Sequence, residues 1–258
     1  GFVFVPLNTH YRRDDLAYAL KQSDSKALIC STQYRANPYL ENVTVLRPSL
    51  PLLAHVFTLE ADYPRLVAEG RSFTPVAPDP GAVAALLYTS GTTGFPKGAL
   101  LSHRAMMMVA RNSAARLGLE PGSRWTSIIP LFHCAGCILN LLGCLSHGAA
   151  YVGVPSFDPE NMFRIIEAER CTHLSGVPTS YLAMLDHPAR GAYDLSSLRA
   201  GSCGGADCNP DVLARCAAEF PMPGLSQVYG QTEGGTLFAC PQHDDPLRWE
   251  TAGLPLPD

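Results

Sequence analysis

The stretch Leu87-Tyr-Thr-Ser-Gly-Thr-Thr-Gly-Phe-Pro-Lys-Gly98 is the most informative part of this sequence. An apolar run leads into small and hydroxylated residues, which are followed by a lysine. Glycines let a ligand approach the backbone closely, and successive N–H groups with Ser and Thr hydroxyls can surround phosphate oxygens. Lys97 adds a mobile positive charge. The stretch therefore predicts a phosphate-binding loop that follows a strand and precedes a helix.

This loop is not a Walker phosphate loop, which would read G-x-x-x-x-G-K-[ST]. Pro96 stands where the second glycine of that motif belongs, and Gly98 replaces the hydroxyl that would hold magnesium. A polar turn without function is the alternative interpretation. Turn chemistry alone does not require the unbroken run of small and hydroxylated residues from Ser90 to Gly94.

Outward from the loop, short apolar runs rich in β-forming residues alternate with helical patterns. This alternation predicts an α/β fold with substantial parallel sheet, because parallel strands need crossover connections. Predicted strands span residues 27–30, 55–59, 83–88, 125–129, 150–154, 173–177, 198–201 and 226–229. Predicted helices span residues 13–22, 103–117, 136–146, 159–170, 178–186 and 210–219, with Ser102 and Asp158 as N-caps and Pro159, Pro178 and Pro210 at first helical positions. The proline-rich residues 73–80 predict a seam between two subdomains.

Composition excludes several classes of protein. The 258 residues are 47% hydrophobic, enough for a large core, and the net charge of -4 offers no basic surface for nucleic acid. No apolar run approaches the roughly 18–20 residues of a membrane span, so we expect no span and a cytoplasmic location. The nine cysteines are scattered through apolar segments and favour reduced core thiols. The single C-x-x-C, Cys134 to Cys137, leaves a redox or zinc site as an alternative.

Three further segments follow predicted strands and carry functional groups. His133 lies in Pro130-Leu-Phe-His-Cys-Ala-Gly136, where the strand ends predict a cleft. Gly204-Gly205-Ala206 offers bare backbone against which a flat ring can lie. Tyr229-Gly-Gln-Thr-Glu233 places an aromatic face, a hydroxyl and a carboxylate close together. Taken singly, each segment could be a packing histidine, a glycine turn or a helix start.

Together, in this order, the four segments resemble the signatures of the adenylate-forming superfamily, which includes acyl-CoA synthetases, luciferases and the adenylation domains of peptide synthetases. The resemblance covers essentially the whole chain and implies most of the large N-terminal domain of such an enzyme, with mostly parallel sheets flanked by helices. Asp207-Cys208 departs from the Pro-Leu that usually follows the adenine segment, and Leu254 stands where a basic residue is frequent.

The resemblance also implies a role for each segment. The phosphate loop would hold the β- and γ-phosphates of ATP through Thr89, Ser90, Gly91, Thr92, Thr93, Gly94 and Lys97. Adenine would lie on Gly204, Gly205 and Ala206 and stack on Tyr229, with Gly230 and Gln231 also at the nucleotide. His133 would flank the substrate carboxylate, Thr232 would bond the α-phosphate, and Glu233 would hold Mg²⁺. Magnesium prefers such a hard carboxylate ligand beside phosphates.

The implied reaction joins a carboxylate to the α-phosphorus of ATP, expels pyrophosphate, and passes the acyl group to CoA. A carboxylate is already ionised at neutral pH, so no general base is needed. The uncharged residues 134–144 favour a medium- or long-chain fatty acid, with an aryl acid second. Members of the superfamily that activate amino acids place an aspartate just after the Phe of this segment, whereas this sequence reads Phe132-His-Cys-Ala135, so the resemblance disfavours an amino acid.

Two other functions stay open: a ligase that loads the phosphopantetheine of an acyl carrier protein, and a non-catalytic nucleotide-binding module. The family also needs a ribose-binding aspartate, a hinge and a lysine from a small C-terminal domain. We expect these beyond Asp258, so residues 1–258 are expected to form a partial domain that turns over very slowly, if at all, on its own.

Overall fold

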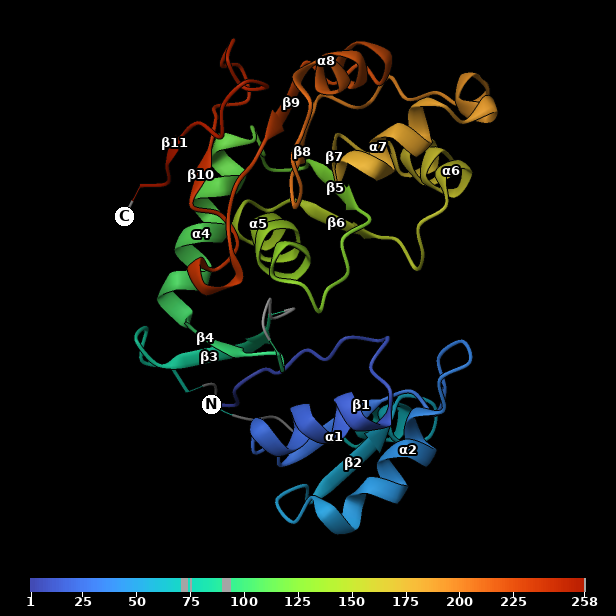
Figure 1. Cartoon of the computed structure of the whole chain (residues 1–258), viewed down its shortest axis with the longest axis vertical. Helices are drawn as coiled ribbons and strands as arrows, with labels where there is room; N and C mark the ends of the chain where they lie inside the picture. Colours follow the sequence, from blue (N-terminus) through green and yellow to red (C-terminus); the bar gives the residue numbers. More distant parts are fainter. Residues whose placement is uncertain (71–73, 75, 90–93, 258) are drawn as a thin grey trace. The chain divides into compact units, whose positions relative to one another are not determined.

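The computed structural model describes residues 1–70, 74, 76–89 and 94–257. The chain forms two compact units, Gly1–Leu100 and Leu101–Asp258, each described here by itself (Figure 1). Ser90, Gly91, Thr92 and Thr93 of the predicted phosphate loop lie outside the described residues. The seam at residues 73–80 stays a prediction, since it includes residues outside the described part and the boundary between the two units comes later in the chain.

The first unit is built on short paired strands and amphipathic helices. Strand β1 (Ala27–Cys30) pairs in parallel with β2 (His55–Thr58), and β3 (Val83–Tyr88) lies next to β4 (Gly98–Ser102). Helices α1 (Arg13–Gln22), α2 (Tyr39–Leu46) and α3 (Asp62–Ala68) complete it, with a 3₁₀ turn at Arg47–Ser49. Its core is apolar: Leu16, Leu20, Val43, Leu50 and Leu53.

Two differences from the sequence predictions occur here. The phosphate loop is followed first by β4 and only then by α4 (His103–Arg116), so the predicted strand–loop–helix order is wrong by one strand. Helices α2 and α3 were not predicted. Helix α2 contains Val43, Thr44 and Val45, whose branched side chains are weak helix formers, and α3 has a proline within its first turn.

The second unit contains a five-stranded parallel sheet in the order β6-β5-β7-β8-β9. The strands are β5 (Arg124–Ser127), β6 (Ala150–Gly153), β7 (His173–Gly176), β8 (Ala200–Cys203) and β9 (Gly224–Gln227). The α/β fold with parallel sheet is thus confirmed. Predicted and observed strand ends differ by up to two residues, because each strand ends where its pairing with a neighbouring strand ends. Tyr229, for example, lies beyond the end of β9 and pairs with Ala239 instead.

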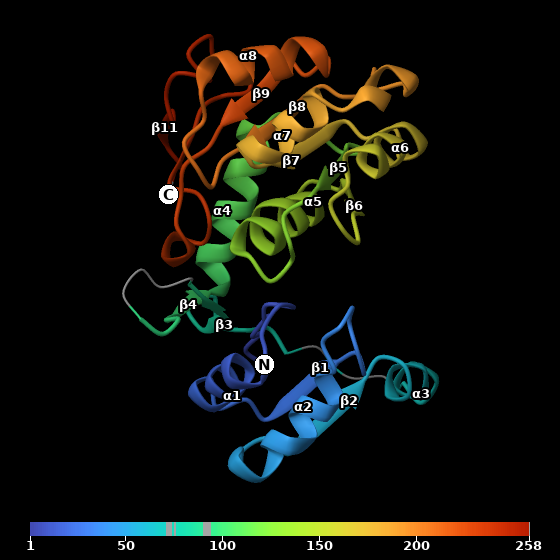
Figure 2. The same cartoon turned by 45° about the vertical axis from the view of Figure 1, so that its right-hand side comes forward.

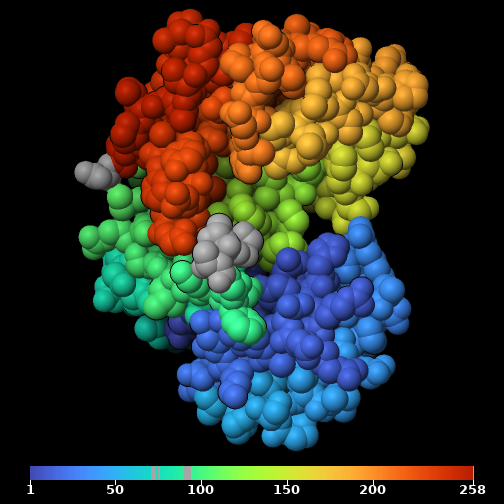
Figure 3. Space-filling model, in the orientation of Figure 1, coloured from blue at the N-terminus to red at the C-terminus, as the bar shows by residue number. Residues whose placement is uncertain are grey.

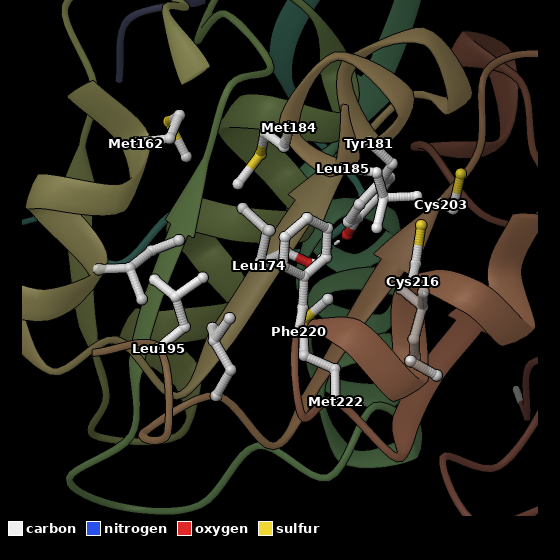
Figure 4. Packing of buried hydrophobic residues seen from close by; sticks show 14 of the residues in the cluster. Met162, Leu174, Tyr181, Met184, Leu185, Leu195, Cys203, Cys216, Phe220 and Met222 are labelled. Atoms are coloured by element: carbon white, nitrogen blue, oxygen red, sulfur yellow. Dashed lines mark hydrogen bonds between the residues drawn. The ribbon is translucent and has the colours of Figure 1, made fainter. Parts of the chain in front are cut away.

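Helices cover both faces of this sheet (Figures 1 and 2). One core cluster joins α6 (Pro159–Glu169), α7 (Pro178–Leu185) and α8 (Pro210–Glu219) to the strands. The other joins α4 to the π-helix η2 (Ala135–Leu142), which continues as α5 (Gly143–Ser146). Figure 4 shows the first cluster, where the hydroxyl of fully buried Tyr181 donates to the carbonyls of Leu174 and Ser202. Full burial of an apolar side chain of this cluster, such as Leu174 or Phe220, contributes about 1.5–3 kcal/mol.

The predicted helix starts are confirmed. Ser102 Oγ accepts the amide N–H of Ala105 at 3.2 Å, and Asp158 Oδ1 accepts that of Asn161 at 2.9 Å. Pro159, Pro178 and Pro210 occupy the first turns of α6, α7 and α8, where a missing N–H costs no helical hydrogen bond.

A C-terminal segment lies against α4. Strand β10 (Ala239–Cys240) pairs antiparallel with β11 (Leu254–Pro255), and Arg116 of α4 donates to the carbonyls of Cys240, Leu254 and Pro255. Figure 3 shows the red atoms of this segment over the green of α4. None of the helices in the described ranges is long and apolar enough to cross a bilayer.

Candidate active site at the carboxyl edge of the sheet

Three of the four predicted segments belong to the second unit and follow strands of one parallel sheet. The His133 segment follows β5, Gly204–Ala206 follows β8, and Tyr229–Glu233 follows β9. Since all five strands are parallel, their carboxyl ends share one edge. After β5 the chain continues to β6, which lies on one side of β5 in the sheet. After β7 it continues to β8, which lies on the opposite side, so the direction of strand order reverses between β5 and β7. In open α/β sheets this switch point is where ligands bind.

The segments after β5 and β9 are in contact. The thiol of Cys134 donates to Thr232 Oγ1 at 3.7 Å, and its sulfur lies 3.8 Å from Nδ1 of His133. The amide N–H of Ala135 donates to the same Nδ1 at 3.1 Å. Because Nδ1 accepts this hydrogen bond, the neutral His133 ring carries its proton on Nε2. The exposed ring therefore offers an N–H donor away from the backbone.

Cys134 and His133 influence each other's titration. The sulfur of Cys134, which can accept a hydrogen bond from a protonated ring, raises the pKa of His133, and partial desolvation of the ring offsets some of this increase. Burial raises the pKa of Cys134, but His133, Thr236 and Thr232 together outweigh it and lower that pKa. The Ala135 N–H opposes a proton on Nδ1, so we assign the neutral thiol and neutral imidazole as the resting pair. Sequence inspection treated Cys134 only as part of a C-x-x-C and missed its contact with Thr232.

Gly204 and Gly205 form a bare backbone surface beside β9. A Cβ on Gly204 would lie 2.8 Å from Val228 Cγ2 and from the Val228 carbonyl oxygen. Gly205 has φ +81°, a left-handed conformation that favours glycine. Gly205 and Ala206 are exposed, as is Tyr229, half of whose surface (52%) is open to solvent. A flat ring thus has both exposed backbone and an aromatic face available to it on neighbouring strands.

A tight turn after β9 presents Thr232 and Glu233. Residues Thr232–Gly234 form a 3₁₀ turn, and the amides of Gly234 and Thr236 donate back to the carbonyl of Gln231. A Cβ on Gly230 would lie 1.6 Å from the Thr236 carbonyl oxygen, so only glycine fits. Glu233 is exposed and has no ion-pair partner within the described part of the chain. Its carboxylate can accept a cation.

Buried polar groups connect the strands beneath this edge. Ser175 Oγ accepts from Trp125 Nε1 and Asn140 Nδ2, each at 3.0 Å, and lies 2.6 Å from Ser202 Oγ. Having accepted two hydrogen bonds, Ser175 donates its own proton to Ser202. These residues come from β5, η2, β7 and β8, so the hydrogen bonds tie the switch point together. Nothing in the sequence pattern indicated this network.

The phosphate loop belongs to the first unit, and its two described ends are held together. The amide N–H of Thr89 donates to the Lys97 carbonyl at 2.9 Å. On the Lys97 side, Tyr18 of α1 stacks on Phe95, with ring centroids 5.1 Å apart, and its hydroxyl donates to the Pro96 carbonyl at 2.9 Å. Gly94 and Lys97 are exposed. Tyr18 is a second residue near the predicted site that motif inspection missed.

Glu233 could serve as one ligand of a magnesium ion whose other ligands are phosphate oxygens and water. Among the residues that the structure describes, no group of three or more His, Cys, Asp or Glu side chains is placed to hold a metal. Magnesium commonly takes one or two carboxylates and completes its coordination with phosphate oxygens and water. A single carboxylate beside a nucleotide site suits that arrangement better than a zinc site, which needs three or four protein ligands.

The whole chain, residues 1–258, matches the AMP-binding enzyme family, and the chain belongs to that family. The full length of the chain aligns with 52% of YngI of Bacillus subtilis (strain 168) at 35% identity, and YngI is itself provisionally named an acyl-CoA synthetase. A second alignment, at 28% identity, joins 93% of the chain to 44% of the mitochondrial medium-chain acyl-CoA ligase ACSF2 of Danio rerio.

A solved structure also shares this fold. ATP-bound MatB from Rhodopseudomonas palustris matches with a TM-score of 0.85 and 23% identity, over 99% of this chain and 50% of that one. The predicted fold, that of the N-terminal domain of adenylate-forming enzymes, is confirmed. The chain spans about half the length of the curated relatives it matches.

Proposed function

We propose that this chain is the nucleotide- and acid-binding part of an AMP-forming acyl-CoA ligase, which activates a carboxylic acid with ATP and then forms a thioester with CoA. The contact of Cys134 with Thr232 supports it most, because it brings the acid-binding segment after β5 and the phosphate-binding turn after β9 together at the switch point. The family membership and the acyl-CoA ligases among the relatives agree with this function.

The chemistry needs alignment and charge neutralisation rather than a base. The substrate carboxylate attacks the α-phosphorus as an anion. Nε2–H of His133 can donate to a carboxylate oxygen and orient it, because Nδ1 is already occupied by Ala135. Thr232 accepts from Cys134, which leaves its hydroxyl proton free for an α-phosphate oxygen. Preorganised donors of this kind stabilise charge that develops in the transition state.

Glu233 is the proposed magnesium ligand, and Lys97 with the phosphate loop is proposed to hold the β- and γ-phosphates. When bound, Mg²⁺ supplies neutralisation of the phosphate charge. Adenine is proposed to lie between Gly204–Ala206 and Tyr229, with Gly230 and Gln231 beside it. The exposed aromatic ring and the bare glycine backbone support this placement.

A medium- or long-chain fatty acid is the proposed substrate. Helix η2 begins two residues after His133 and carries no charge, so an alkyl tail could run along it. One relative is a medium-chain acyl-CoA ligase. An aryl acid is the second candidate. CoA is the proposed acceptor, with an acyl carrier protein as the alternative, and the cytoplasmic location stays a prediction.

The test is acid-dependent ATP–pyrophosphate exchange by the full-length protein, with fatty, aryl and amino acids offered in turn. We expect exchange with one acid class and a loss of at least 100-fold in Glu233→Gln, because the magnesium ligand is removed. Glu120→Gln is the matched control, since Glu120 is an exposed acid of the same unit outside the site. ATP binding without exchange for any acid would instead indicate a non-catalytic nucleotide-binding module.

A further inference from the structure

Two thiols stand at the two ends of the proposed adenine segment. Cys203 is the last residue of β8, Cys208 precedes the N-cap of α8, and Gly204–Asp207 lie between them. Their sulfurs share a hydrogen bond at 3.3 Å. The Cys208 thiol also lies 3.4 Å from the carbonyl oxygen of Ala206, so it can hold the adenine segment directly.

The pair is almost fully covered by protein yet adjoins a cavity. Cys203 is 0% and Cys208 5% exposed. A cavity of about 150 Å³ is lined by both cysteines together with Pro178, Leu182, Val212 and Leu213. A water-sized molecule occupies about 30 Å³ in the liquid, so hydrogen peroxide has room beside the sulfurs.

The two thiols differ in chemical character. Contact with the neighbouring Cys203 thiol lowers the pKa of Cys208, although burial and Asp207 oppose this. The same contact, with burial, raises the pKa of Cys203. Cys208 is therefore the better nucleophile and Cys203 the resolving thiol, since the thiolate is the reactive form.

We propose that Cys203 and Cys208 form a redox-active dithiol whose oxidation to a disulfide loosens nucleotide binding at the adenine segment. Hydrogen peroxide is the oxidant. The Cys208 thiolate attacks one peroxide oxygen, the O–O bond breaks, and hydroxide leaves and takes up a proton, which gives a sulfenic acid. Cys203 then attacks that sulfur, the S–O bond breaks, and a second water leaves. Two thiols are oxidised, and one peroxide is reduced to two waters.

The consequence for the adenine segment follows from geometry. A disulfide requires the sulfurs to approach from 3.3 Å to about 2.05 Å. Its formation removes the Cys208 proton that the Ala206 carbonyl can accept. It also draws together the ends of a segment in which Gly204 lies so close to Val228 that an added Cβ would meet it at 2.8 Å. This effect on binding rests on the proposed function, whereas the disulfide itself does not.

The first experiment maps the bond in the full-length protein. After treatment with hydrogen peroxide and alkylation of free thiols, a non-reducing digest is analysed by mass spectrometry. We expect a Cys203–Cys208 disulfide that dithiothreitol removes, that is absent in Cys208→Ser, and that persists in the control Cys30→Ser, a cysteine of the other unit. Cys216 lies in the same core cluster (Figure 4), and a Cys203–Cys216 bond in place of the expected one would overturn the proposal.

The second experiment measures ATP affinity by calorimetry in the reduced and oxidised protein. We expect oxidation to weaken binding about tenfold in the wild type and in Cys30→Ser, with no change in Cys208→Ser. If the disulfide forms but the ATP affinity stays the same, oxidation does not regulate binding and the proposal is overturned. If no disulfide forms while ATP still binds, the redox-active dithiol is overturned and the proposed function is unaffected. The disulfide without ATP binding in either state would contradict the proposed function and leave the dithiol standing.

Discussion

Single atoms decide the shape of the turn that carries Thr232 and Glu233. The backbone of Gly230 lies against the Thr236 carbonyl, where a Cβ would come within 1.6 Å, so this position tolerates no side chain without backbone movement. The following residues form a 3₁₀ turn that begins at Thr232, whose hydroxyl accepts a hydrogen bond from the Cys134 thiol. A side chain at position 230 would therefore disturb the turn that carries the proposed catalytic hydroxyl.

At this scale we expect Gly230→Ala to abolish most of the exchange activity. The added methyl forces the turn away from Thr236, which displaces Thr232 and lowers the free energy of unfolding by about 1–3 kcal/mol. Exchange assays and urea unfolding measure the two effects. Gly191→Ala is the matched control, because a Cβ at Gly191 meets nothing within 4 Å. Equal activity in the two variants would contradict a fixed turn.

At the scale of elements, β7 is held at its start by a buried histidine. Nε2 of His173 is 3.2 Å from the Leu117 carbonyl after α4, and Nδ1 is 2.8 Å from Thr172 Oγ1. The ring is 2% exposed, and burial lowers the pKa of His173 to about 4, which the hydrogen bonds to Leu117 and Gly118 only partly offset. The neutral ring is thereby the form that joins helix and strand.

A pH dependence follows with a definite sign. The pKa of His173 in the unfolded chain is near 6.5, so below that pH the unfolded state binds a proton at His173, whereas the folded state keeps the ring neutral down to about pH 4. Stability is therefore lost as pH falls from about 6.5 to about 4. Between pH 7 and pH 5 we expect a loss of about 2 kcal/mol from this residue. Urea unfolding at both pH values tests it: His173→Gln should lack this loss, and an unchanged slope in the variant would rule it out.

At the scale of the whole molecule, the segments proposed to bind ATP are distributed over both units of the chain. The phosphate loop belongs to Gly1–Leu100, whereas the adenine segment and Glu233 belong to Leu101–Asp258. A ligand that binds only the folded state stabilises it by mass action, by about 2.7 kcal/mol at a hundred times its Kd.

We therefore expect ATP with Mg²⁺ to raise the Tm by about 5–10 °C for a protein of this size. Chelation of the metal should reduce this shift, and Glu233→Gln should make the shift insensitive to metal. Differential scanning calorimetry with and without ATP, Mg²⁺ and chelator provides the measurement. The absence of any shift at saturating ATP would contradict the nucleotide site.

Local sequence patterns determined the α/β class, the main helix starts and the family. Ser102 and Asp158 could be predicted as N-caps, because capping depends only on residues a few positions further along the chain. The strand–segment order was equally visible, because buried strands and glycine-rich loops differ in local composition. The motif residues before β4 and after β5, β8 and β9 could accordingly be named from the sequence, although their roles stay predictions.

Only the tertiary structure decided which distant residues meet. Cys134 contacts Thr232, Tyr18 holds Pro96, and Ser175 joins Trp125 to Asn140, all across long separations in the chain. Strand order decided that β5 and β7 flank the switch point, and the approach of β8 and β9 decided that Gly204 can carry no side chain. These contacts arise from packing between elements, which no local periodicity encodes, because each depends on residues that become neighbours only when the sheet forms.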